Sequence, residues 1–148
     1  MFSKRSLFLR HLGQTSPAPM LLEIERAEGV YLFDNDGKPY IDLISGVSVS
    51  NVGHRHHKVV EAVKRQIDNY MHLMVYGEII QSPQVQYATK LAVLLPKGLD
   101  VCYFVNSGSE AVEGALKLAK RFTGRSRIIS CKNGYHGSSH GALSIHGN

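Results

Sequence analysis

The sequence has no tryptophan and only two cysteines among 148 residues. Two cysteines exclude a disulfide-rich scaffold, and Cys102 and Cys131 both fall in apolar runs, where a buried, reduced thiol is expected. Long apolar runs are also missing, and no secretory signal is present, so we predict a protein that does not span a membrane. A reducing cytoplasm fits these features best.

The positive charge is not concentrated in any one stretch. Lysine and arginine number 17 against 12 acidic residues, which gives a net charge of +5, but the basic residues are scattered between glutamates. Because a nucleic-acid-binding surface gathers basic residues on one face, we predict no nucleic-acid partner. The positive charge instead suits a phosphorylated cofactor and a carboxylate substrate.

Two well-known phosphate-binding patterns are absent. The sequence contains neither Gly-x4-Gly-Lys-Ser/Thr nor Gly-x-Gly-x-x-Gly, so a small, complete nucleotide-binding protein is not expected.

A different phosphate-binding pattern is present. The apolar run 101–105 is followed by residues 106–111 (NSGSEA) and by apolar residues at helical spacing, which together predict a strand, a turn and a helix. The first N–H groups of a helix lack partners and carry partial positive charge, so the amides of Gly108, Ser109 and Glu110 can bind one phosphate. An ordinary capped helix after a strand is the alternative.

A second predicted strand, residues 127–131, leads into a loop that contains Tyr135 between two glycines. In an open parallel sheet, ligands bind at the carboxyl ends of the strands. The Tyr135 ring can therefore lie against a flat heteroaromatic cofactor. A turn tyrosine packed on its own sheet is the alternative.

Four segments together resemble a known family. Residues 29–42, 53–56 (GHRH), 106–111 and 135–137 (YHG) are similar, in this order, to the pyridoxal phosphate (PLP) enzymes of aminotransferase class III, which include acetylornithine, ornithine and 4-aminobutyrate aminotransferases. The resemblance implies an α/β protein of fold-type I, with a small-domain hairpin followed by the start of a large parallel-sheet domain. It also implies a homodimeric enzyme that moves an amino group from an amino acid or amine to a 2-oxo acid.

The resemblance assigns cofactor contacts to five residues. Ser107, Gly108 and Ser109 would bind the PLP phosphate, Tyr135 would stack on the pyridine ring, and His136 would lie beside that ring.

Further roles are implied for the substrate and for the dimer. Ornithine aminotransferases carry a tyrosine that faces the substrate where Val47 stands, so Val47 is a substrate-facing candidate and argues against an ornithine-specific pocket. Tyr76 and Glu78 fall in a region that crosses the dimer interface in these enzymes. A loop packed on its own domain is the alternative for that region.

The family also needs a Schiff-base lysine, which lies well downstream of the Tyr-His-Gly segment. Lys117, Lys120 and Lys132 do not match its position. We therefore expect the N-terminal part of an aminotransferase, inactive by itself and in need of further strands and helices. An aminomutase or decarboxylase of the same fold, or a non-catalytic phosphate-ligand-binding fragment, remains an alternative.

The expected domains are residues 1–52, an N-terminal arm with a small-domain hairpin, and residues 53–148, the start of the PLP-binding domain. Asn35-Asp36-Gly37 between two apolar segments predicts the hairpin turn. Residues 1–20 are basic, which is also typical of a mitochondrial presequence, but we expect a retained structural arm.

Three histidines, His54, His56 and His57, lie close together in the sequence. No cysteine or carboxylate stands around them at ligand spacing, so we predict the start of a helix here and no metal. Another helix is predicted over residues 84–95, which end before Pro96.

Overall fold

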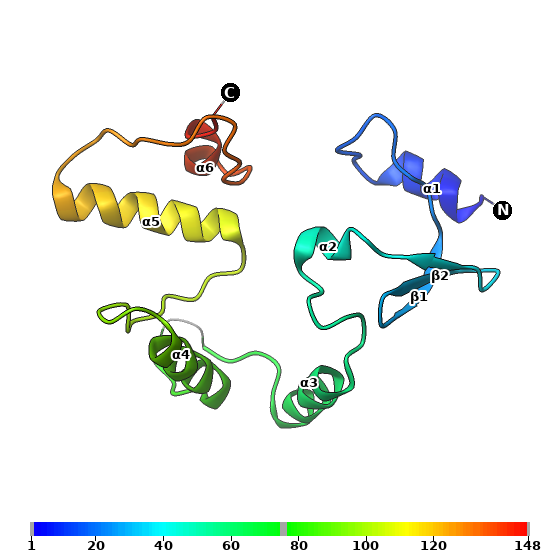
Figure 1. Ribbon diagram of the computed structural model, residues 1–148, viewed down its shortest axis with the longest axis horizontal. Coiled ribbons are helices and arrows are strands. Elements are labelled where there is room, and N and C mark those ends of the chain that lie inside the picture. The colour runs from blue at the N-terminus through cyan, green and yellow to red at the C-terminus, as the bar shows by residue number, and fades with distance from the viewer. Residues whose placement is uncertain (1, 75–76, 148) are drawn as a thin grey trace. The chain divides into compact units, whose positions relative to one another are not determined.

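The computed structural model describes residues 2–74 and 77–147 (Figure 1). The chain divides into two compact units, Met1–Val75 and Tyr76–Asn148. The predicted boundary between residues 52 and 53 refers to the domains of the complete enzyme fold, so it stays a prediction.

The two units contain nine named elements in the described residues. The first unit holds helix α1 (Lys4–His11), strands β1 (Ile24–Glu28), β2 (Tyr31–Asp34) and β3 (Pro39–Ile41), the short turn α2 (Ser45–Ser48) and helix α3 (His57–Asn69). The second unit holds helices α4 (Ser82–Leu94), α5 (Gly108–Thr123) and α6 (His140–Ser144).

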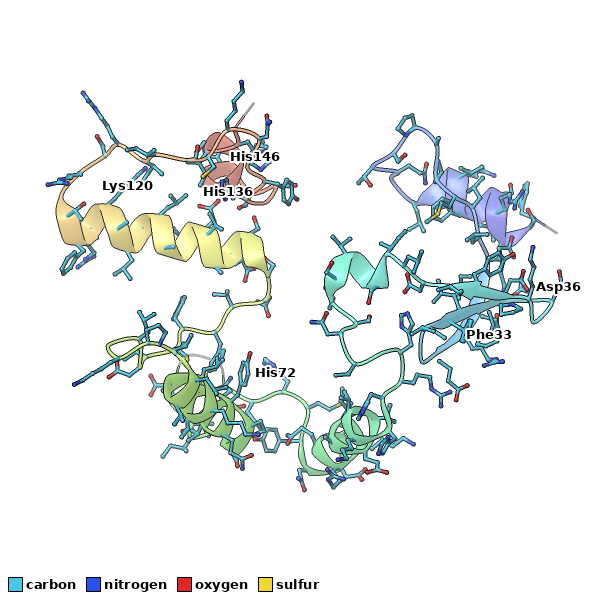
Figure 2. All side chains as sticks on the ribbon, in the orientation of Figure 1. Phe33, Asp36, His72, Lys120, His136 and His146 are labelled. Atoms are coloured by element: carbon cyan, nitrogen blue, oxygen red, sulfur yellow. The ribbon has the colours of Figure 1, made fainter. Side chains whose placement is uncertain are left out.

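The predicted hairpin is confirmed: β2 and β3 pair in antiparallel fashion. Asp34 forms the turn, since its Oδ1 accepts hydrogen bonds from the backbone N–H groups of Asp36 (3.0 Å) and Lys38 (2.9 Å). Gly37 has a φ of 79°, a conformation that favours a residue without a Cβ. Figure 2 shows Asp36 at the tip of this hairpin and Phe33 on the sheet. The sequence did not predict β1, which pairs with β2 on its other side.

The predicted helices are confirmed. α3 begins at His57, and α4 begins two residues before its predicted start, with Pro83 in its first turn, where a missing N–H costs nothing. α5 begins after Ser107 and ends at Gly124, whose φ of 69° forms a left-handed cap.

The two strands predicted over residues 101–105 and 127–131 do not form, and this prediction is wrong for the structure. The sheet β1-β2-β3 is the one sheet in residues 2–74 and 77–147. A parallel strand needs strands beside it and helices over both faces, whereas Val101 is 89% exposed and Ile129 is 98% exposed. Without cover for its side chains, neither segment gains the burial that would hold it in a sheet.

The same two segments carry the cysteines, which are therefore less buried than predicted. Both are free thiols, but Cys102 is half-buried and Cys131 is exposed, so the prediction that both are buried is wrong.

Ala142 is the one hydrophobic residue of the described chain that is fully buried. Among the described residues, no helix has the length and apolar character needed to cross a membrane, and no three His, Cys, Asp or Glu side chains cluster as metal ligands.

Candidate cofactor site

A cleft in the second unit brings together the five predicted cofactor contacts. It is lined by Ser107, Gly108 and Ser109 at the start of α5 and by Tyr135 and His136 in the loop before α6. The loop also contributes Gly137, Ser138 and Ser139. Val47 belongs to the first unit, where it lies on α2 and is 82% exposed.

The start of α5 is defined by side-chain capping. Ser107 has an extended backbone, and its Oγ accepts a hydrogen bond from the N–H of Glu110 at 3.1 Å. The Glu110 carboxylate reaches back and accepts from the N–H of Asn106 at 2.8 Å. This return contact is one residue earlier than in a standard capping box, but it satisfies the same end of the helix.

Capping leaves two N–H groups for a ligand. Of the three amides predicted to bind a phosphate, that of Glu110 donates to Ser107 Oγ in this structure. No acceptor among the described residues takes the N–H groups of Gly108 and Ser109. These two donors lie at the positive end of a 16-residue helix, where an anion is favoured.

A hydrogen-bonded cluster joins α5 to α6. Ser109 Oγ lies 2.6 Å from Ser139 Oγ, and Ser139 Oγ donates to Glu113 Oε1 at 2.6 Å. The same carboxylate oxygen accepts from the N–H groups of Gly141 (2.7 Å) and Ala142 (3.1 Å). Figure 1 shows α6 beside α5 as a result. The pKa of Glu113 is held below its ordinary value, chiefly by the Ser139 hydroxyl and then by the Ala142 amide.

Glu113 and Ser139 were not predicted as site residues from the sequence. A signal was present, because Glu113 follows Ser109 by four residues and therefore lies on the same face of α5. The partner of Glu113 comes from 26 residues further along the chain, and a single sequence does not reveal such a contact.

Gly137 allows the loop to approach the helix. Its φ is 123°, and a Cβ at this position would lie 2.7 Å from Ser109 Cβ and 2.9 Å from Ser109 Cα. Any larger residue would push the loop away from the start of α5.

The aromatic side of the cleft is formed by Tyr135 and His136, and the ring of His146 lies next to both without lining the cleft. The Tyr135 ring is 76% exposed, and its centroid lies 5.0 Å from that of His146. The ring centroids of His136 and His146 lie 6.4 Å apart, and Figure 2 shows these two residues together near α6. His136 Nε2 is buried and has no hydrogen-bond partner in the part of the chain that the structure describes. The site therefore offers a tyrosine ring available for stacking, whereas the Nε2 atom of His136 is enclosed by the protein near Gly134.

Residues 13–148 match the protein family described as Aminotransferase class-III. The chain belongs to this family. It is 40% identical over 136 residues to the acetylornithine aminotransferase of Archaeoglobus fulgidus, an alignment that covers 92% of this chain and 35% of that protein. It is 42% identical over 136 residues to the acetylornithine aminotransferase of Methanopyrus kandleri, covering 90% of this chain and 33% of that protein. The chain thus spans about a third of the length of these relatives.

Solved structures agree with this assignment. The adenosylmethionine-8-amino-7-oxononanoate aminotransferase of Methanocaldococcus jannaschii superposes with a TM-score of 0.89 at 32% identity, over 97% of this chain and 35% of that one. The taurine:2-oxoglutarate aminotransferase of Bifidobacterium kashiwanohense, in complex with PLP and glutamate, gives a TM-score of 0.85 at 34% identity, over 97% and 32% of the two chains. The predicted family, fold class and PLP cofactor are confirmed.

The cleft fits the phosphate end of PLP. It presents two N–H donors without acceptors at a helix start, beside a tyrosine ring that is available for stacking. No lysine lines it among the described residues.

Proposed function

We propose that this chain supplies the phosphate-binding and ring-stacking part of a PLP-dependent aminotransferase. The observation that carries the proposal is the pair of free N–H groups on Gly108 and Ser109, which lie in one cleft with the exposed ring of Tyr135. When bound, PLP supplies the electron sink that lets an amino group pass between an amino acid and a 2-oxo acid.

Each of the five predicted contact residues has a distinct task in this proposal. The Gly108 and Ser109 amides hold the phosphate. Ser107 Oγ accepts from Glu110, so its own proton remains to be donated to a phosphate oxygen. Tyr135 packs against the face of the PLP ring, and His136 lies beside that ring. These contacts orient the cofactor and do not themselves move a proton of the substrate.

In this proposal, none of the lysines described here forms the Schiff base with PLP. Lys117 and Lys120 lie on α5 beyond its first two turns, and Lys132 precedes the cofactor loop. None of the three lines the cleft.

An acetylornithine-type amino donor is the first substrate to test, since relatives at 40% and 42% identity carry that name. Val47 remains the proposed substrate-facing residue. It is small, aliphatic and exposed, which suits the stem of an aliphatic amine. The proposed acceptor is a 2-oxo acid.

The proposal includes a homodimer in the cytoplasm without a nucleic-acid partner. Exposed apolar side chains support association, and Ile80, which is 91% exposed, follows the predicted interface residue Glu78 closely. The other predicted interface residue, Tyr76, lies outside the described residues. The free thiols of Cys102 and Cys131 support a reducing compartment.

The proposed function is tested by PLP affinity in the natural protein that contains this chain. Ser109→Pro removes one phosphate-binding N–H, while proline is tolerated in the first turn of a helix. Ser109→Ala is the matched control, because it keeps the N–H. We expect the proline variant to bind PLP about 100-fold more weakly than wild type and the alanine variant only about fivefold more weakly. Equal losses of PLP affinity in the two variants would show that the Ser109 N–H does not bind the phosphate.

The lysine assignment is tested by borohydride reduction in the presence of PLP, followed by peptide mass analysis. We expect no pyridoxyl-lysine within residues 1–148. One saturable adduct at a single lysine of this segment would show that the assignment is wrong, and the absence of any PLP binding by the natural protein would overturn the proposed function.

A further inference from the structure

The donors and acceptors in the cluster of Ser109, Ser139 and Glu113 decide the direction of each hydrogen bond. An ionised carboxylate only accepts hydrogen bonds, and a serine hydroxyl has one proton to donate. Ser139 gives its proton to Glu113 Oε1 at 2.6 Å. The 2.6 Å contact between the two serine oxygens is therefore made by the Ser109 proton, which points to Ser139.

Because the Ser109 proton points to Ser139, the Ser109 hydroxyl is not available to bind the phosphate. Ser109 Oγ also accepts from the N–H of Ser139 at 3.2 Å, so both its proton and one lone pair are engaged with the loop. The Ser109 hydroxyl has no proton left for a phosphate oxygen. Ser109 thus contacts the cofactor through its backbone N–H, while its side chain holds the loop.

Glu113 holds the other end of the loop. Its Oε1 collects the Ser139 hydroxyl and the N–H groups of Gly141 and Ala142 at the start of α6. The fit is close: a Cβ on Gly141 would lie 2.9 Å from Glu113 Cδ, and Ala142 is fully buried. The loop that carries Tyr135 is therefore joined to α5 through one carboxylate and two hydroxyl groups.

We infer that Glu113 is a positioning residue for the cofactor site. Acting through Ser139, it fixes the direction of the Ser109 hydroxyl and holds Tyr135 beside the phosphate-binding end of α5. This inference rests on the proposed function, because the site it positions is the proposed PLP site.

The first test is a double-mutant cycle on PLP affinity in the natural protein. We expect Ser109→Ala and Ser139→Ala each to weaken binding about fivefold. The double variant should be no weaker than the worse single variant, because both substitutions break the same connection. Ser139→Thr, which keeps the hydroxyl, should restore most of the affinity. Losses that multiply would mean that the Ser109 hydroxyl binds the phosphate directly, and a threonine variant as weak as alanine would mean that the hydroxyl is not needed; either result overturns the inference.

The second test does not depend on PLP. Hydrogen exchange of the Gly141 and Ala142 amides should be at least about tenfold faster in Glu113→Ala, because both amides lose their acceptor. Glu113→Gln keeps an acceptor oxygen, so the exchange rates of the two amides should rise less than in the alanine variant. The glutamine variant also keeps the test possible if the alanine variant does not fold. Glu61→Ala, on the exposed surface of α3, is the matched control and should exchange like wild type.

The two tests separate the possible failures. If the natural protein binds no PLP, the proposed function fails and the cofactor role of Glu113 fails with it, whereas the exchange experiment still decides whether Glu113 holds the loop. Unchanged exchange in both Glu113 variants would overturn the inference even if PLP binds.

Discussion

His54 Nε2 lies 2.7 Å from Asp42 Oδ2, and this pair closes the segment that contains α2. The other carboxylate oxygen of Asp42 accepts from the N–H groups of Ile44 (3.1 Å) and Ser45 (2.8 Å). The pKa of Asp42 is accordingly held below its ordinary value, first by the Ser45 amide and then by His54. The backbone of His54 forms a two-way bridge with Gly29, at the end of β1. One carboxylate thus joins the turn to the sheet.

The segment needs such support because α2 is a left-handed turn. Ser45, Gly46, Val47 and Ser48 have φ values of 52°, 61°, 61° and 64°. This conformation costs roughly 1–2 kcal/mol for each residue other than glycine, and it is least suited to a β-branched valine. The hydrogen bonds of Asp42 offset part of that cost and hold Val47 in an exposed position.

We therefore predict that His54→Ala loosens this turn. The melting temperature should fall by roughly 2–8 °C, the range that corresponds to about 1 kcal/mol in a small domain, and proteolysis within residues 44–52 should become faster. His72→Ala, an exposed histidine outside the turn (Figure 2), serves as the control. Equal melting temperatures for the two variants would show that the pair with Asp42 does not stabilise the turn.

The contact between Glu113 and α6 should depend on pH. The Ser139 hydroxyl and the α6 amides depress the pKa of Glu113 in the folded state below its ordinary value of 4.5, and Lys117 adds a smaller effect in the same direction. A depressed carboxyl pKa stabilises the fold above the ordinary value, and this stabilisation is lost as the pH falls through the folded-state pKa. We predict that protection of the Gly141 amide declines only below pH 4.5. The decline should be absent in Glu113→Gln, and a decline that persists there would assign it to another group.

A side chain at Gly137 should destabilise the protein because it would collide with Ser109. Gly98 serves as the control for the conformational cost alone. Gly137→Ala places a Cβ against Ser109 and also forces alanine into a φ of 123°. Gly98→Ala meets only the conformational cost, because its φ is 96° but no atom lies within 4 Å of the new Cβ. We expect about 1–2 kcal/mol of destabilisation for Gly98→Ala and a further 1–3 kcal/mol, roughly, for Gly137→Ala. Chemical denaturation measures both, and equal values would mean that the loop can move away from α5 without cost.

Local patterns predicted the parts of this chain whose structure is decided locally. The spacing of Ser107, Glu110 and Gly124 defines α5 because caps act within a few residues of the helix end. The turn at Asp36 and Gly37 defines the hairpin for the same reason. The five cofactor contacts came from the resemblance to the family, and the cleft brings them together.

The strands that were wrongly predicted and the contacts that were not predicted both depend on segments far apart in the sequence. The strands over residues 101–105 and 127–131 have the apolar composition of buried strands, but composition does not supply the neighbours that pair with them. The contact of Glu113 with Ser139 and that of Asp42 with His54 span 26 and 12 residues. Neither pair follows a periodicity of one helix or strand, so a single sequence gives no sign of it.

Tyr135 provides the clearest test of the aromatic side of the cleft. Its ring is exposed, and its hydroxyl lies 3.3 Å from Ser138 Oγ, so the ring and the hydroxyl can be examined separately. Tyr135→Ala removes both and should weaken PLP binding about 3- to 10-fold, the range expected for one aromatic stacking contact. Tyr135→Phe keeps the ring and should lose clearly less than the alanine variant. The affinity and the visible absorption of bound PLP measure the difference. If phenylalanine and alanine lose affinity equally, the hydroxyl is the group that matters, and Tyr135 does not stack on the cofactor.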